Sequence, residues 1–139
     1  MSRPNGRSVR AWFVAVIAAA LAATVLGGCA AMSRPTRPAA ISHVVFVKLK
    51  NAAEAPALIA DSDRLLPAIP GVVSYACGRH LDTGRTNIDG NYDVGLYVGF
   101  DDEAGYRTYV DHPNHVQLVN TWRSKWEWIR IHDVRDSTP

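Results

Sequence analysis

Apolar and polar residues alternate with period two in several short segments downstream of residue 40. Residues 41–50 combine this alternation with many β-branched side chains, which predicts a strand. His43, Val45 and Val47 share one face of this strand. The same pattern predicts three further strands, over residues 72–80, 92–100 and 126–134.

Between the first two strands, the spacing changes to intervals of three and four residues. This spacing predicts a helix over residues 53–66, with Leu58, Ser62 and Leu65 on its inner stripe. Pro67 ends the helix because proline cannot donate a backbone hydrogen bond.

A second helical stretch follows the third strand, and a proline divides it. Asp101 or Asp102 can cap a helix that runs to about residue 110. Pro113 disfavours helical geometry at the residue before it and fits the first turn of a new helix, over about 114–123. The order of elements is therefore βαββαβ, with the second helix broken.

This order is that of a ferredoxin-like α+β sandwich, in which helices cover one face of a four-stranded antiparallel sheet. The strands, however, are apolar on both faces. Strict alternation in the last strand places Trp126 and Trp128 opposite Ile129. The uncovered face would be a large apolar patch on a monomer, so we expect a homodimer that packs sheet against sheet about a two-fold axis.

The first 28 residues have the pattern of an export signal. Three arginines in residues 1–10 precede an uncharged run over residues 11–26, which is short for a membrane-spanning helix. The ending Leu-Gly-Gly-Cys resembles the lipobox of bacterial lipoproteins, which implies cleavage before Cys29 and acylation of its thiol. An uncleaved membrane anchor is the alternative.

Cleavage before Cys29 would leave a mature chain with three parts. Residues 29–40 become a lipidated tether, residues 41–135 the folded domain and residues 136–139 a tail. Acyl chains on Cys29 predict an exported protein at the periplasmic face of a membrane. The absence of Asp at Ala30 resembles outer-membrane sorting.

Composition narrows the classes of function. A chain of 139 residues suits one folded domain. The net charge of +2 comes from the leader, because the chain after residue 28 has 12 basic and 13 acidic residues. We expect no nucleic-acid partner, since the third strand also lacks an RNA-binding sheet pattern.

Only Cys29 and Cys77 are cysteines, which excludes a disulfide framework and predicts an inert, buried Cys77 thiol.

Candidate chemistry gathers at the break between the two helices. His115 shares an apolar stripe with Leu118 and Trp122, so its imidazole faces inward. Tyr109 ends the preceding helix, and His43 lies on the strand face that the helices would cover. If that face is the covered one, these three residues could converge on one pocket. A neutral imidazole there is a workable base near neutral pH, and a tyrosine hydroxyl can donate to a carbonyl or enolate oxygen. A structural role for each of the three is the alternative.

Other kinds of site are poorly supported. His112 can serve as a helix cap, and with His115 it lacks a third metal ligand, so we expect no metal site. The sequence also contains no phosphate-binding glycine loop and no nucleophile elbow.

Five stretches resemble the stress-responsive dimeric α/β-barrel family (Dabb). They are S-H-V-V-F-V-K-L-K, I-P-G-V, Y-D-V-G-L-Y-V-G-F-D-D, Y-x-x-H-P-x-H-V and W-E-W-I-R-I-H-D. The resemblance covers about residues 41–135. It implies a ferredoxin-like domain that dimerises into an α/β barrel.

One plant member of this family, olivetolic acid cyclase, closes a linear polyketide by aldol condensation without a cofactor. The resemblance to it implies His115 as a general base, Tyr109 as its assisting group and His43 as a pocket residue. The other implied pocket-lining residues are Val45, Val47, Leu96, Val98, Leu118, Trp126, Ile129, Ile131 and Asp133.

These observations predict a lipid-anchored envelope protein that binds a small apolar ligand between the sheet and the helices, with no cofactor. The alternatives are a cofactor-independent cyclase or isomerase with a His–Tyr acid–base pair, and a purely structural dimer. A cavity of roughly 300 Å³ or more, lined by the residues named above, favours the first two, whereas a filled core favours the third.

Overall fold

The computed structural model describes residues 36–137. The predicted signal peptide, the lipidated Cys29 and most of the tether lie outside this range. The described elements are β1 (Ile41–Leu49), a 3-10 turn η1 (Ala52–Glu54), α2 (Ala55–Leu65), β2 (Val72–Gly78), β3 (Val94–Phe100), α3 (Glu103–Asp111), α4 (Pro113–Trp122), a second 3-10 turn η2 (Arg123–Lys125) and β4 (Trp126–Arg135). None of these helices is long and apolar enough to cross a membrane.

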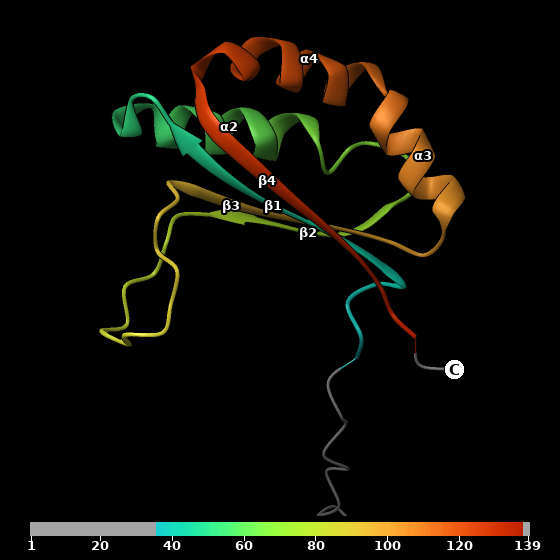
Figure 1. The fold of residues 1–139 in the computed structure, drawn as a ribbon. Coiled ribbons are helices and arrows are strands. Elements are labelled where there is room, and N and C mark those ends of the chain that lie inside the picture. Colours follow the sequence, from blue (N-terminus) through green and yellow to red (C-terminus); the bar gives the residue numbers. More distant parts are fainter. Residues whose placement is uncertain (1–35, 138–139) are drawn as a thin grey trace, which may run out of the picture. The chain divides into compact units, whose positions relative to one another are not determined.

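The four strands form one antiparallel sheet in the order β2-β3-β1-β4. Figure 1 shows α2, α3 and α4 together on one face of it. The predicted ferredoxin-like α+β fold and its βαββαβ order are thereby confirmed. In the register, His43 lies between Val98 on β3 and Asp133 on β4, so these three side chains share the face under the helices.

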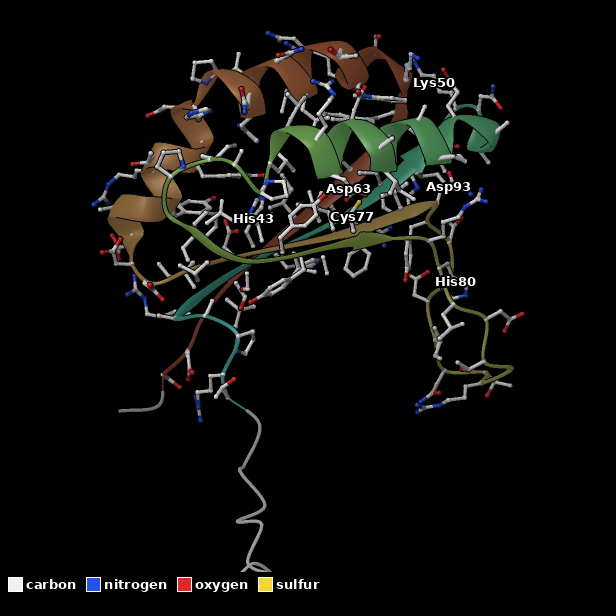
Figure 2. All side chains as sticks on the ribbon, turned by 180° about the vertical axis from the view of Figure 1, so that it is seen from behind. His43, Lys50, Asp63, Cys77, His80 and Asp93 are labelled. Carbon is white, nitrogen blue, oxygen red and sulfur yellow. The ribbon has the colours of Figure 1, made fainter. Side chains whose placement is uncertain are left out.

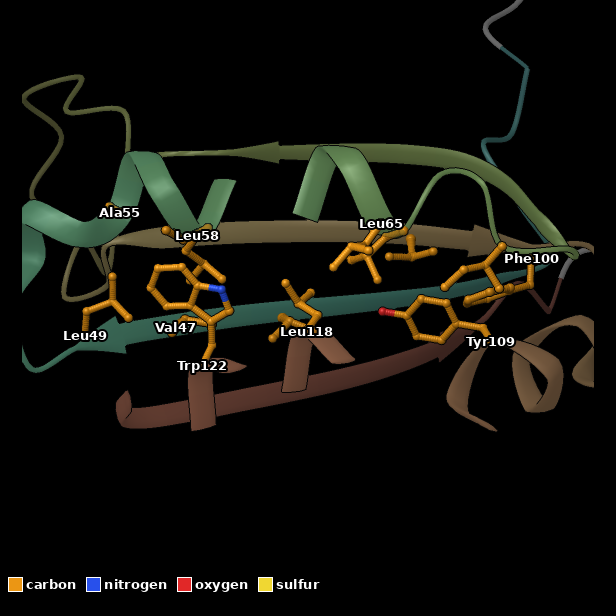
Figure 3. Packing of buried hydrophobic residues seen from close by; sticks show 14 of the residues in the cluster. Val47, Leu49, Ala55, Leu58, Leu65, Phe100, Tyr109, Leu118 and Trp122 are labelled. Carbon is orange, nitrogen blue, oxygen red and sulfur yellow. The ribbon is translucent and has the colours of Figure 1, made fainter. Parts of the chain in front are cut away.

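The core lies between this face and the helices (Figure 3). β1 shows strict alternation, with its odd-numbered residues buried and its even-numbered ones half-buried. Leu58, Ser62 and Leu65 are buried along α2, as their helical spacing predicts. Trp122 closes one end of the core, where its indole N–H donates to Asp61 on α2 at 3.0 Å.

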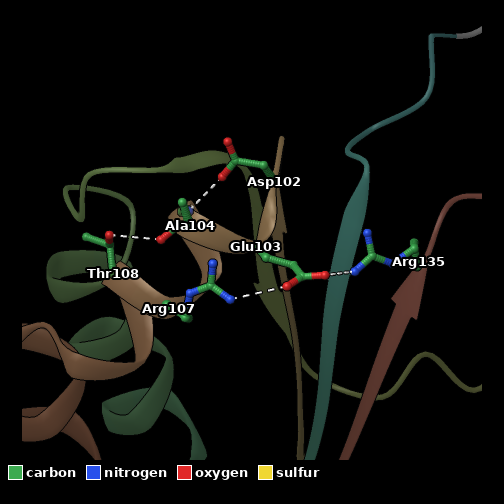
Figure 4. A network of polar contacts seen from close by, with 7 residues as sticks. Asp102, Glu103, Ala104, Arg107, Thr108 and Arg135 are labelled. Atoms are coloured by element: carbon green, nitrogen blue, oxygen red, sulfur yellow. Dashed lines mark hydrogen bonds and ion pairs between the residues drawn. The ribbon is translucent and has the colours of Figure 1, made fainter.

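The break between α3 and α4 has the expected causes. The Asp102 carboxylate accepts a hydrogen bond from the Gly105 amide at 2.8 Å and caps α3. His112 has extended backbone before Pro113, and its Nδ1 accepts from the Asn114 amide at 3.2 Å, so it caps α4. Figure 4 shows the polar network at the start of α3, in which Glu103 pairs with arginines on both α3 and β4.

Strand β4 departs from the strict alternation that the sequence predicts. Lys48 pairs with Trp128, but the next residue of β1, Leu49, pairs with Trp126. Glu127 is therefore the extra residue of a β-bulge, and the bulge shifts the strand by one position. The expectation that Trp126 lies on the same face as Trp128 is wrong, because Trp126 lies on the helix side of the sheet.

The second face of the sheet carries an aromatic and cationic cluster without a helical layer. Phe46 contacts the ring of Tyr92 and the imidazole of His132, with centroids 4.8 and 6.4 Å apart. Arg130 stacks on Trp128 at 4.5 Å. The loop over residues 79–93 extends on this side of the sheet, away from the helices (Figure 1).

Candidate functional site

A cavity of about 430 Å³ lies between the helix-covered face of the sheet and the helices. Strands β1, β3 and β4 contribute side chains to it, and so do helices α2, α3 and α4. The lining residues are His43, Val45, Val47, Leu58, Ser62, Val94, Leu96, Tyr106, Tyr109, Val110, His115, Leu118, Val119, Trp126, Ile129, Ile131 and Asp133. The cavity reaches solvent beside β4, where the lining residue Ile131 is 51% exposed.

Asp133 joins three elements at one end of the cavity. Its carboxylate lies 2.6 Å from His43 Nδ1 on β1, and its other oxygen accepts from the Tyr106 hydroxyl on α3 at 3.0 Å. Because an ionised carboxylate can only accept, His43 Nδ1 carries the proton of this hydrogen bond. His43 is 6% exposed, and Figure 2 shows it under the helices.

His115 is held in a similar way by the backbone. Its Nδ1 lies 2.9 Å from the carbonyl oxygen of Val110, near the end of α3. A carbonyl only accepts, so Nδ1 donates and Nε2 keeps the free lone pair. Burial lowers the pKa of His115 below its usual value and outweighs the hydrogen bond to Val110, which favours the charged ring. The imidazole is therefore neutral, and able to take a proton, at neutral pH.

Tyr109 contacts both histidines. Its ring centroid lies 4.6 Å from that of His115 and 5.7 Å from that of His43. The side chain is 1% exposed, and its hydroxyl points along the core toward Leu118 (Figure 3). Burial raises the pKa of Tyr109, so the hydroxyl keeps its proton. Within residues 36–137 this hydroxyl has no hydrogen-bond partner, which leaves it available to a bound molecule.

The other end of the cavity is apolar. Val47, Leu58 and Val94 line it. The only hydroxyl that the described residues place there, that of Ser62, donates to the Leu58 carbonyl at 2.8 Å. Trp126 Nε1 is the one buried side-chain nitrogen or oxygen of residues 36–137 that lacks a partner. The surrounding atoms cover it completely.

The structure brings the three candidate chemical residues together, as the sequence analysis expected. His43, Tyr109 and His115 all line the cavity. Among the residues implied by the resemblance, Val98 does not line it. Val98 is completely buried in the core beside His43 in the sheet, so the packing around it leaves no surface toward the cavity. The others that do line it are Val45, Val47, Leu96, Leu118, Trp126, Ile129, Ile131 and Asp133.

Several residues of the cavity wall were not among those predicted from the sequence. Tyr106 and Val110 belong to α3 together with Tyr109, and they lie four residues apart. Helical spacing was a signal for both. Tyr106 lies three residues before Tyr109 and Val110 lies four residues after Tyr106, and residues three or four apart are neighbours on a helix surface. The other additions are Leu58, Ser62, Val94 and Val119. Leu58 and Ser62 lie on the predicted inner stripe of the first helix, and Val94 lies two residues before Leu96 on the same face of β3.

The arrangement suits proton transfer next to a carbonyl group better than metal chemistry. It combines a neutral imidazole base, a protonated phenol and an apolar chamber. Within residues 36–137, no group of three or more His, Cys, Asp or Glu side chains is placed to hold a metal ion.

Comparison with known proteins supports the fold. A Dabb-family protein with a ferredoxin-like fold from Mesorhizobium loti is 31% identical, with a TM-score of 0.60 over 70% of this chain and 97% of that one. A dimeric ferredoxin-like protein of unknown function from Thermobifida fusca is 24% identical, with a TM-score of 0.59 over 69% and 90%.

A hydroxynitrile lyase from Passiflora edulis has the same fold. It is 17% identical, with a TM-score of 0.62 over 74% of this chain and 99% of that one. No curated protein sequence matches the chain. The family model that matches is the Stress responsive A/B Barrel Domain (Dabb), and its match spans residues 41–136. The chain therefore belongs to the Dabb family.

Proposed function

We propose that this protein binds a small, largely apolar molecule in the cavity between the sheet and the helices. The observation that carries the proposal is the cavity of about 430 Å³ between the sheet and the helices. A protein with a purely structural role would be expected to fill this space with its own side chains. Ligand sites in proteins have volumes of about 300–1,000 Å³, mostly apolar walls and a few convergent polar groups. Here the polar groups are His43, Tyr109 and His115.

A titration with butylbenzene, which has no polar head, tests this function. Leu118→Trp places an indole in the cavity and is expected to abolish binding. Val116→Trp is the matched control, because Val116 lies on the same helix but is 43% exposed and outside the cavity. Calorimetry should give binding for the unchanged protein and for Val116→Trp only. Equal binding by Leu118→Trp would place the molecule elsewhere and contradict the proposal.

The site supports a second candidate function, cofactor-independent acid–base catalysis of an isomerisation or a ring closure. The specific observation is the hydrogen bond from His115 Nδ1 to Val110, which leaves Nε2 as the free base of a ring that packs against Tyr109. Nε2 would take a proton from the carbon next to a carbonyl, and the Tyr109 hydroxyl would donate to the resulting enolate oxygen.

Hydrogen exchange tests that chemistry without knowledge of the natural substrate. In D2O, the protein should speed exchange of the hydrogens next to the carbonyl of butyrophenone, because a deuteron returns to the same carbon. NMR would follow the exchange. His115→Ala should reduce the rate by about 10²-fold or more, since general-base catalysis contributes about that much. A rate equal to that of buffer for the unchanged protein would reject the catalytic candidate and leave the binding function intact.

The chain also has the surface of a homodimer. The sheet face opposite the helices carries Val44, Phe46 and Trp128 without a covering layer within residues 36–137. The Thermobifida fusca relative is described as dimeric, and it shares the fold. We infer that a second copy covers this face, related by a two-fold axis.

We further propose that Cys29 is lipidated and anchors the exported protein to a membrane at its periplasmic face, in the outer membrane of a two-membrane cell. The support is the basic, apolar and Leu-Gly-Gly-Cys pattern of residues 1–29. Labelled palmitate should be incorporated into the unchanged protein and not into Cys29→Ser, whereas Cys77→Ser should still be labelled. Palmitate on the Cys29→Ser protein would refute the lipidation.

A further inference from the structure

The polar groups of the cavity are gathered at one end of it. His43, Tyr106, Tyr109 and Asp133 are connected there by two hydrogen bonds and by ring contacts. His115 joins them through its contact with the Tyr109 ring. A bound molecule can therefore make hydrogen bonds at this end, to the Tyr109 hydroxyl and to the His115 Nε2 atom.

The apolar end offers a ligand no hydrogen-bonding group. The Ser62 hydroxyl is already paired with the Leu58 carbonyl, and Trp126 Nε1 is covered by other atoms. An oxygen placed at this end would lose its hydrogen bonds to water without replacement, which weakens binding. A chain that carries oxygens along its length therefore fits poorly, and one with a single polar head fits well.

The charge at the polar end also limits the head group. Among residues 36–137, no lysine or arginine lines the cavity, and Asp133 is the only carboxylate that does. An anionic head would lie near this carboxylate with no lysine or arginine of residues 36–137 beside it. Burial disfavours the charged form of His115, so His115 does not supply that cation at neutral pH.

We infer that the ligand of this cavity is a neutral amphiphile with one oxygen-bearing head, a hydroxyl or a carbonyl, on an alkyl or aryl body. The head lies between Tyr109 and His115, and the body fills the end lined by Val47, Val94 and Leu118. This inference rests on the proposed binding function and adds the class of molecule to it.

Three probes that share one body test the inference by calorimetry at neutral pH. They are para-butylphenol, with a neutral hydroxyl head; para-butylbenzoate, with an anionic head; and butylbenzene, with no head. We expect the phenol to bind at least about tenfold more tightly than either of the others, which corresponds to about 1.4 kcal/mol. Equal affinities for all three would overturn the inference and leave the binding function standing, whereas no binding of any probe would reject both.

Two substitutions test whether Tyr109 causes the preference for the phenol and whether Asp133 weakens the binding of the benzoate. Tyr109→Phe should remove most of the preference for the phenol over butylbenzene, and Tyr75→Phe is its matched control, because the Tyr75 hydroxyl donates to Asp63 outside the cavity. Asp133→Asn should strengthen benzoate binding, since it removes the negative charge and keeps an acceptor for His43. Unchanged benzoate affinity in Asp133→Asn would contradict the electrostatic part of the inference.

Discussion

His115 has two contacts that serve different purposes. Its Nδ1 satisfies the Val110 carbonyl at the end of α3, which helps to fix the break at Pro113. Its ring packs on Tyr109 beside the cavity. Tyr109 differs, because its buried ring supports the core while its hydroxyl has no partner among the described residues. The two residues can therefore be separated by how their removal changes stability and function.

His115→Ala is expected to lower the free energy of unfolding by about 1 kcal/mol, the typical net contribution of one hydrogen bond. Tyr109→Phe keeps the ring and removes an unpaired hydroxyl, so its effect on stability should be close to zero. Urea unfolding of both variants measures this. A loss above about 3 kcal/mol for His115→Ala would mean that its role is mainly structural.

The pH dependence of stability should show the neutral state of His115. Burial lowers its pKa in the folded protein, so the unfolded chain binds the proton more readily. The stabilising contribution is fully present above the unfolded pKa of about 6.5 and is lost as pH falls from there through the lower folded value. His115→Gln should lose less stability than the unchanged protein between pH 7.5 and pH 5. Parallel unfolding curves for both proteins would contradict the lowered pKa.

The sequence was informative about single residues wherever a periodic pattern located them. Helical spacing put His115 on an inward stripe, and strand alternation put His43 on the covered face. The hydrogen bond between His43 and Asp133 joins positions 90 residues apart, and no local pattern predicts it. It requires the antiparallel register of β1 and β4, which the whole sheet determines. The family resemblance supplied Asp133 as a pocket residue, but not its partners.

At the scale of elements, α3 is the helix that carries Tyr106 and Tyr109 into the site. Its N-terminal cap is the Asp102 carboxylate, which accepts from the Gly105 amide. Asp102→Ala should lower the free energy of unfolding by about 1 kcal/mol, since a lost N-cap typically has that effect. Asp101→Ala is the control, because the neighbouring Asp101 makes no such contact. Thermal melts with equal shifts for both variants would contradict the capping role.

The limits of pattern analysis are clearest in β4. Period-two alternation assigns Trp126 and Trp128 to one face, but the bulge at Glu127 moves Trp126 to the other. A bulge inserts one residue without a sequence signal as strong as glycine or proline, so the register after it cannot be read locally. The predicted strands over residues 72–80 and 92–100 were also too long. In the structure β2 ends at Gly78 and β3 begins at Val94.

At the scale of the whole molecule, the second sheet face determines the expected assembly. Sedimentation of the protein without residues 1–35 should give a dimer at micromolar concentration. Val44→Asp places a carboxylate on the uncovered face and should shift the protein toward monomer. Val116→Asp, on the exposed side of α4, should stay dimeric. A stable monomer for the unchanged protein would require another cover for Phe46 and Trp128.

We propose that the chamber between the sheet and the helices accepts a molecule whose polar head meets Tyr109 and His115. A crystal structure of the purified protein soaked with para-butylphenol would show this binding. We expect density for the phenol oxygen within hydrogen-bonding distance of the Tyr109 hydroxyl or His115 Nε2, with the butyl chain toward Val47 and Leu118. A chamber filled by the protein's own side chains, with the phenol absent or bound elsewhere, would contradict it.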